Sequence, residues 1–569
     1  MRIPRIAGGM HPIANWREER FMRKVCLILL VAGLVPVLAG PGFAWQGRMG
    51  GMGDPYGLVD DESDFLVLPS RIAEDRGVRY YGDARFLLRD VRDLNWSARQ
   101  SGPIRVSGTE LTGFHLAGDW SASGSSWDYG TLVGAAFPAG AGRLGVFFDY
   151  RGQTGDFDGK QGLFAGFPGT GNRLAASSAF DMEAGTDDFN LRVVYGQAVG
   201  GELSIGGEIQ VAHRREENRY RNVLSGLTVN DAVLDIGVAL QNDFLGELYP
   251  FMKPFDSTSW EVLFKGGMEG RLGPARVGMD VHGGPVFGGD NTLDHAGVVS
   301  AGALALENAF RLKGDVSGWQ AGGDIWVRYP CSDTVSLPFS LRVNYRDKTR
   351  DGRGTGDFAI RIGPSIATHS MGWEYGHKET NLDIEAGGGI DVQVSRDLEV
   401  ASGLYYNFIR ARERLNIAAM PGIVVFDDPV VIGLSDDPFP RTTQHLVKLK
   451  VAAERKLGSS RLRGGITAFG GRVSEEYAFS LGAPSLFGVT LLSGGGSLEG
   501  STWGIMGAFG AGMQFQGCTV EPFIQAGYQA FSLDGDGRTR ALDALIVVPW
   551  TLDKNRNEAL VGAGVSVAF

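Results

Sequence analysis

The chain has 569 residues, of which 86 are Gly; 10% are aromatic, 21% are charged and the mean hydropathy is −0.05. After the N-terminal region no apolar run approaches the ~20 residues of a membrane-spanning helix, so the composition excludes a bundle of membrane helices. The net charge of −11 excludes a nucleic-acid-binding surface, because such surfaces need clustered Lys and Arg.

The first predicted element is an export signal within residues 1–44. Met22, Arg23 and Lys24 precede an apolar stretch from Val25 to Leu38, and small residues follow before Trp45. A basic start, a short apolar core and small residues at the cleavage point form a secretory signal. A membrane anchor is the alternative, but the apolar core is too short to span a bilayer comfortably. We therefore predict that residues 1–44 are an N-terminal extension and a cleaved signal peptide.

Residues 45–103 precede the main repeat pattern. A Gly-rich run from Gly47 to Gly53 is followed by acidic residues between Asp60 and Asp64, and then by the apolar segments Phe65–Leu68 and Tyr80–Leu88. The apolar segments need a surface to dock on. We predict a periplasmic arm or a partial plug of the lumen, and an extra strand is a third possibility.

From residue 104 to the C-terminus, segments of alternating polarity recur. In 203–212 and 339–346 every second residue is apolar, which is the pattern of a strand with one apolar face. Short turns such as Gly200-Gly201 alternate with long polar connections such as 152–187 and 284–316. A soluble sandwich or propeller would have shorter strands. The pattern predicts an all-β chain whose residues 104–569 form a single large transmembrane antiparallel β-barrel of 16–18 strands, with a best count of 18, short periplasmic turns and long extracellular loops.

The C-terminus carries a family resemblance. Val565, Val567 and the terminal Phe569 occupy every second position of the last predicted strand. This strand resembles the C-terminal strand of bacterial outer-membrane β-barrel proteins, and no subfamily is identified. The resemblance implies a location in the outer membrane of a Gram-negative bacterium, contact with outer-membrane lipid, and recognition of these three residues by the barrel-assembly machinery.

The polar face of the predicted strands contains many charges. Charges at membrane depth need water or partners, and a barrel of this width can enclose an aqueous channel. Clustering of basic residues on neighbouring strands suggests one basic wall, whereas pairing of the charges across strands is the alternative. The predicted lumen-lining residues are Arg192, Glu208, Lys265, Asp280, Asp324, Arg328, Arg342, Arg346, Arg361, Asp391, Lys448 and Lys450.

One long connection, 214–257, contains an apolar pattern from Val233 to Leu248 that predicts a short amphipathic helix ending before Pro250. Its apolar face would need a partner. The helix would either narrow the mouth of the barrel or cap the extracellular rim.

No catalytic motif, nucleotide-binding loop or metal-ligand spacing is found in the sequence, so we expect no enzyme activity, no cofactor and no metal. The main prediction is a porin-like channel for passive diffusion of small hydrophilic solutes through a mixed-charge lumen. The alternatives are a transporter for apolar or larger ligands, with the N-terminal segment plugging the lumen, and a surface-interaction barrel without transport. Assembly into a homo-oligomer is left open.

Overall fold

The computed structural model describes residues 77–568 with short gaps, and before Gly77 it describes Met52, Leu58, Leu66 and Leu68–Glu74. No helix of these residues is long and apolar enough to cross a membrane. The gaps are 167–172, 230–231, 235, 242–254, 290, 302–303, 421–423, 426–427, 430–431, 436–440, 484–488, 516–517 and 542–544.

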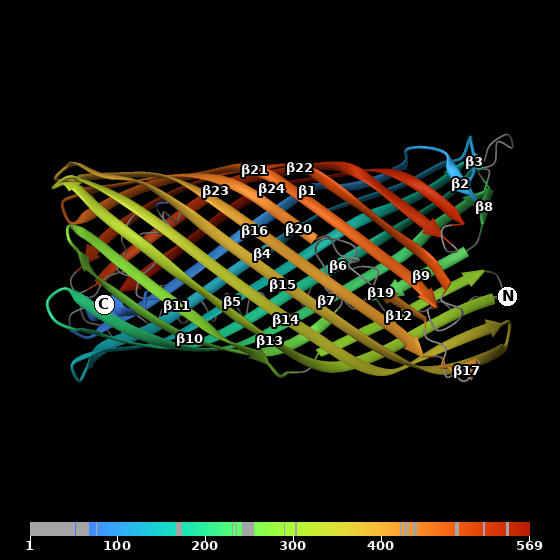
Figure 1. Cartoon of the computed structure of the whole chain (residues 1–569), viewed down its shortest axis with the longest axis horizontal. Helices are drawn as coiled ribbons and strands as arrows, with labels where there is room; N and C mark the ends of the chain where they lie inside the picture. The colour runs from blue at the N-terminus through green and yellow to red at the C-terminus, as the bar shows by residue number, and fades with distance from the viewer. Residues whose placement is uncertain are drawn as a thin grey trace.

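The described strands form a closed antiparallel barrel, shown from the side in Figure 1. Sixteen strands complete the ring, because the first strand pairs with both the second and the last. The ring consists of β1 (Arg79–Gln100), β4 (His115–Ala139), β5 (Gly142–Gly166), β6 (Arg173–Ala198), β7 (Leu203–Val229), β10 (Phe255–Leu272), β11 (Ala275–Phe287), β13 (Leu304–Ser332), β14 (Val335–Ile362), β15 (Ser365–Ser395), β16 (Leu398–Met420), β20 (Arg441–Leu457), β21 (Ser460–Ala483), β22 (Val489–Phe515), β23 (Cys518–Ala541) and β24 (Ile546–Ala568).

The predicted fold class is therefore confirmed, at the lower end of the predicted strand count. The short turns lie at the end of the barrel that also holds the C-terminus, on the left of Figure 1, and we call this the periplasmic end. Short additional strands are β2 (Ile104–Val106), β3 (Thr109–Leu111), β8 (Ala232–Leu234), β9 (Ile236–Gln241), β12 (Asn291–Ala301), β17 (Val424–Val425), β18 (Asp428–Pro429) and β19 (Ile432–Ser435).

Two expectations from the sequence are corrected by these strands. The apolar pattern that begins at Val233 forms β8 and β9, which pair with β7, instead of a helix; residues 242–248 of the expected helix lie outside the described residues. The barrel also begins earlier than residue 104, because β1 is a full member of the wall between β24 and β4, as the third possibility for this segment, an extra strand, had it. β8 and β9 pair with the edge that β7 presents beyond the aromatic belt, and β1 closes the ring between β24 and β4, so both segments pair strand edges that would otherwise be open.

A row of aromatic rings divides the wall into two levels. Tyr150, Phe189, His213, Trp260 and Phe287 are direct register partners on five successive strands. Ring centroids are 4.7 Å apart for Tyr150–Phe189 and again for His213–Trp260. Because aromatic rings collect at the boundary between lipid and water, this aromatic belt marks the extracellular membrane surface.

Between the aromatic belt and the periplasmic turns the outer face is apolar. Val281 is 62% exposed and Ile524 is 61% exposed, and β11, which runs from the turn to Phe287, has 13 residues. About 9–11 residues suffice for a tilted strand to cross a bilayer. An apolar band of this height on a closed barrel is the architecture of outer-membrane proteins. The chain is thus a bacterial outer-membrane β-barrel, as the C-terminal resemblance implied.

The strands continue far beyond the aromatic belt. They reach 31 residues in β15, and the segment 152–187, predicted to be a long loop, is mostly the extracellular part of β5 and β6. Outside the bilayer both faces of a strand can be polar, so the alternation that identifies strands at membrane level ends at the aromatic belt. The predicted loops were too long for this reason.

Candidate functional site

Residues from the N-terminal segment lie inside the barrel near its periplasmic end. We call Met52, Leu58 and Leu68–Glu74 the plug residues; Pro69–Glu74 form the 3-10 helix η3. Ile72 is fully buried in a cluster with Tyr81, Phe147 and Val194, whose side chains point inward from β1, β5 and β6. A second cluster joins Met52 and Leu58 to inner-face alanines of β16 and β20. The plug is therefore held by apolar packing at two places.

Glycines on the inner face of the wall make room for the plug residues. A Cβ atom at Gly196 would lie 2.8 Å from Cγ2 of Ile72, and one at Gly206 would overlap the backbone of Pro69 and Ser70. At the second place, a Cβ atom at Gly389 would lie 2.7 Å from Cδ1 of Leu58, and one at Gly465 would overlap the Met52 backbone. Side chains at these positions would clash with the plug residues. The glycines of the wall therefore provide the space that the plug residues occupy.

Two arginine contacts fix the plug to one side of the wall. Nε of Arg71 donates to Oε2 of Glu269 at 2.9 Å, and its guanidinium lies 4.3 Å from the ring centroid of Trp326. Nη2 of Arg328 donates to the carbonyl oxygen of Leu58 at 3.0 Å, while Nη1 of the same side chain donates to Asp391 at 2.8 Å. Both contacts are largely shielded from water, where a charge-assisted hydrogen bond is strong.

Above the plug, charged side chains form a connected band on the inner face. Arg192 lies 3.7 Å from both Asp149 and Glu208, and Lys265 lies 3.4 Å from Asp280. Asp280 is the register partner of Asp324. The band continues through Arg342–Asp324 at 2.8 Å and through the two contacts of Glu385 with Lys448 and Lys450.

Alternation along the strands places eleven of the twelve predicted lumen-lining residues on the inner face: Arg192, Glu208, Lys265, Asp280, Asp324, Arg328, Arg342, Arg346, Asp391, Lys448 and Lys450. Arg361 is the exception. It lies an odd number of residues from Arg346 on β14, so it faces outward, and it pairs with Glu307 at 3.0 Å. The prediction for Arg361 was wrong because it took Ile360 and Ile362 as lipid-facing. These two isoleucines lie on the inner side of β14, beyond the aromatic belt.

The predicted basic wall is neutralised. Arg328 pairs with Asp391 and Arg342 with Asp324, while Arg346 contacts Glu261. Pairing of charges across strands was the alternative interpretation of this set, and the geometry supports it. Pairing of opposite charges weakens the transverse field that a basic wall facing an acidic one would give.

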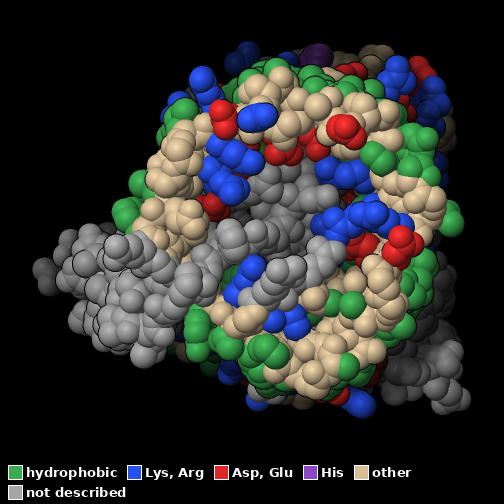
Figure 2. Space-filling view, turned by 90° about the vertical axis from the view of Figure 1, so that its left-hand side faces the viewer, with side chains coloured by type: hydrophobic (Ala, Val, Ile, Leu, Met, Phe, Trp, Pro, Cys, Tyr) green, Lys and Arg blue, Asp and Glu red, His purple; other side chains and the backbone are tan. Residues whose placement is uncertain are grey.

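Looking into the periplasmic end, Figure 2 shows Lys and Arg side chains next to Asp and Glu side chains around a hollow in the wall. The two signs are interspersed along this edge, and neither forms a separate half-ring. The rim at this end of the barrel therefore carries both signs of charge side by side.

A buried ionic cluster lies beyond the aromatic belt. Nη2 of Arg350 donates to Glu216 at 2.6 Å, although these residues come from β14 and β7, which are not neighbours in the wall. Nη1 of Arg350 lies 3.0 Å from Nδ1 of His377 and also contacts Glu379. Burial lowers the pKa of His377, so its neutral form can accept this hydrogen bond. Burial likewise lowers the pKa of the neighbouring Lys348 to about 8.

The same cluster contains a possible metal-ligand set. Ligand atoms of His377, Glu379 and Glu413 lie within 4.8 Å of one another. The Arg350 guanidinium already contacts His377 and Glu379, and it supplies the positive charge that a cation would bring. The arrangement therefore fits an ion-paired structural cluster better than a metal centre.

Beyond the aromatic belt, the inner face of the sector opposite this ionic cluster is apolar. Trp120 stacks on Phe180 with ring centroids 5.2 Å apart, in a cluster that includes Phe157 and Met182. Another cluster brings Leu498, Leu533 and Leu552 together. On β1 and β4–β6, one hydrophobic cluster therefore lies at the plug and a second lies beyond the aromatic belt. The charged band of the inner face lies between these two clusters.

The glycines that make room for the plug residues were not predicted from the sequence, although the signal lies in which glycines occupy inward positions. Gly145, Gly196, Gly206 and Gly267 all alternate with lipid-facing apolar residues, which was the available signal. The predicted assembly-signal residues Val565 and Val567 pair with β1 and β23, and Phe569 lies outside the described residues, as does the predicted signal peptide.

No protein-family model matches the chain, and no curated protein matches it. Among solved structures, the chain is similar to a Pseudomonas aeruginosa FadL homologue, with 12% identity, 94% of this chain and 99% of that chain covered, and a TM-score of 0.36. It is also similar to the CymD monoaromatic hydrocarbon channel (10% identity, 94% and 97% covered, TM-score 0.37) and to the Pseudomonas putida toluene transporter TodX (11%, 93% and 98%, 0.35). At these values the similarity assigns no ligand to this chain.

Proposed function

We propose that the protein is an outer-membrane transporter for apolar small molecules, with the plug residues acting as a hatch at the periplasmic end. The observation that carries the proposal is the burial of apolar plug residues on a glycine-lined seat inside the barrel. This geometry supports the plugged alternative better than passive diffusion of hydrophilic solutes, which needs a water-filled passage.

The energetics of the seat favour an apolar ligand. Met52, Leu58, Leu68 and Ile72 are each at most 2% exposed, and burying such a side chain contributes roughly 1.5–3 kcal/mol. Opening the hatch would break the apolar contacts of these four residues. The hatch therefore opens only if a ligand provides equivalent contacts. A ligand shifts an equilibrium by no more than its difference in affinity for the two states. An apolar molecule that packs against Tyr81 and Phe147 provides such a difference, whereas a hydrophilic solute does not.

A disulfide lock tests the proposal. A Cβ atom at Gly196 would lie 2.8 Å from Cγ2 of Ile72, so the double variant Ile72→Cys, Gly196→Cys places two cysteines side by side for a disulfide. Uptake is measured in cells with an intact outer membrane, using the apolar dye N-phenyl-1-naphthylamine and the hydrophilic β-lactam nitrocefin. The single variants Ile72→Cys and Gly196→Cys are the controls.

We expect the protein without the disulfide lock to raise the uptake of the dye without raising the uptake of nitrocefin. Oxidation should abolish dye uptake in the double variant alone, and a reductant should restore it. Equal dye uptake in the locked and reduced states would contradict the hatch, and nitrocefin uptake through the wild-type protein would favour a porin. Heat-modifiable migration on gels verifies that each variant is folded.

A further inference from the structure

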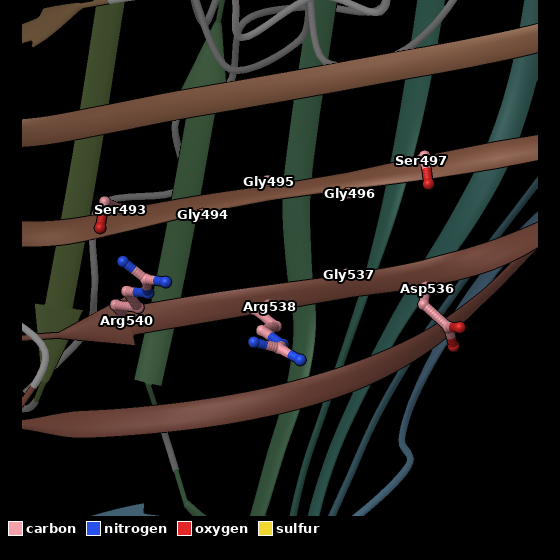
Figure 3. Close-up of a pocket in the computed structure, with 9 residues that line it drawn as sticks. All are labelled: Ser493, Gly494, Gly495, Gly496, Ser497, Asp536, Gly537, Arg538 and Arg540. Atoms are coloured by element: carbon pink, nitrogen blue, oxygen red, sulfur yellow. The ribbon is translucent and has the colours of Figure 1, made fainter.

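The outer surface of the barrel carries a polar depression, on the side of the wall that faces away from the lumen. It has a volume of about 440 Å³ and lies over the extracellular parts of β22 and β23 (Figure 3). Its floor is the run Gly494–Gly496 of β22, flanked by Ser493 and Ser497. The neighbouring strand contributes Asp536, Arg538 and Arg540.

Alternation shows that the charged side chains of this depression point away from the lumen. On β23, Ile524 is exposed to lipid and Leu533 is buried inside the barrel. Arg538 and Arg540 are an even number of residues from Ile524 and an odd number from Leu533. Tyr528 and Trp503, whose rings lie 5.4 Å apart, are outward-facing. They lie about as far from the turn between β22 and β23 as the belt residues of β5–β11 lie from theirs, so they extend the aromatic belt to these two strands. Arg538 is ten residues beyond Tyr528, about 33 Å along the tilted strand.

The two guanidinium groups have no protein partner within the described part of the chain. The register neighbours of Arg538 are Gly495 and Pro549, and those of Arg540 are Ser493 and Val547. None of these four can neutralise a cation. Arg441, two strands from the depression, shows the contrasting case, because it pairs with Glu476 at 3.4 Å. The depression therefore offers two free cations over a floor of small residues.

Figure 3 shows how the polar groups are distributed. Arg540 and Ser493 lie at one end, Arg538 lies in the middle, and Asp536 lies at the other end beside Ser497. A guanidinium pair is suited to a phosphate or carboxylate, since its N–H groups form a fork that matches two anionic oxygens. Asp536 and the serines can accept or exchange hydrogen bonds with sugar hydroxyls. The lining fits an anionic saccharide better than a bare anion.

We propose that this depression binds the phosphorylated or carboxylated sugars of the outer-leaflet glycolipid, lipopolysaccharide. Because the depression lies well beyond the aromatic belt on the outward face, it faces the saccharide layer that the glycolipid extends above the membrane surface. Arg538 and Arg540 hold the anionic group and Asp536 orients a neighbouring sugar. The site is separate from the lumen, and its test does not depend on the proposed transport.

The test measures binding of purified lipopolysaccharide to residues 45–569 in detergent, by microscale thermophoresis. The variant Arg538→Gln, Arg540→Gln should weaken binding by about tenfold or more, because each guanidinium contributes charge-assisted hydrogen bonds. Ser493→Glu, which places a carboxylate opposite Arg540, should weaken it by a smaller factor. Arg441→Gln is the matched control and should leave binding unchanged, as should dye uptake through the lumen in all variants.

Two further ligands distinguish the source of the anion. Lipopolysaccharide from which the phosphates have been removed should bind at least several-fold more weakly than the intact form, and glucose 6-phosphate should not compete at millimolar concentration. Equal binding by the wild type and the double arginine variant would overturn the proposal. Competition by glucose 6-phosphate as strong as that of lipopolysaccharide would overturn the assignment to the glycolipid.

Discussion

The part of the barrel below the aromatic belt and the part above it are built from the same strands but stabilised differently. Below the belt, apolar side chains such as Ile524 face outward, and the charged band and plug lie inside. Above the belt, the outer face is polar at Arg538 and Asp536, and leucines such as Leu533 are buried inside. The surrounding solvent thus decides which face is apolar, and the upper part is packed like a water-soluble protein.

The largest predicted effect breaks a buried charge cluster below the belt. Arg463 is 2% exposed and contacts both Glu454 and Glu521 at 2.7 Å. Arg463→Met should destabilise the barrel by roughly 3–5 kcal/mol, because it leaves two buried carboxylates without their common partner. Urea unfolding in lipid vesicles measures the change. A loss below about 1 kcal/mol would show that water reaches this cluster.

A comparable effect is predicted above the belt, from packing alone. Leu533 is 1% exposed within the cluster that includes Leu498 and Leu552. Leu533→Ala should cost about 2–5 kcal/mol, the usual range for a cavity in a packed core. The same unfolding experiment applies. If the substitution changed stability by only a few tenths of a kcal/mol, the extracellular part would not contain a packed interior.

A charge placed on the outer face should distinguish the two levels directly. Ile524→Arg faces hydrocarbon and should cost roughly 2–4 kcal/mol, as for an arginine at mid-bilayer depth. Ser497→Arg lies on the same face above the belt and should remain within about 0.5 kcal/mol of the wild type. Similar costs at the two positions would mean that the aromatic belt does not mark the membrane surface.

The smallest predicted effect concerns an exposed ion pair. Arg441 and Glu476 are 3.4 Å apart with partly exposed side chains. Arg441→Gln should lower the free energy of unfolding by no more than about 1 kcal/mol, because water and salt screen such pairs. A larger loss, abolished in high salt, would instead reveal a coupled charge network at the rim.

The difference between the two levels also explains what could be predicted from the sequence. Alternation in 203–212 revealed strands because lipid requires one apolar face, and the inward positions of Arg192 and Glu208 followed from the same pattern. The extracellular parts of β5 and β6 were predicted as loops, since no lipid imposes alternation there. Arg361 was placed on the wrong face for the same reason. The contact between Ile72 and Gly196 joins segments 124 residues apart, and alternation within a strand contains no information on such a contact.

The central claim is that the plug residues close the lumen, and planar-bilayer conductance tests it most directly. Residues 45–569, the chain without its predicted signal peptide, are compared with a shorter protein that also lacks residues 45–76 and retains every strand of the wall from β1 onward. Both proteins are first shown to be folded. Little or no conductance is expected for residues 45–569, and stable large steps are expected for the shorter protein. Large steps of equal size from both proteins would contradict the claim.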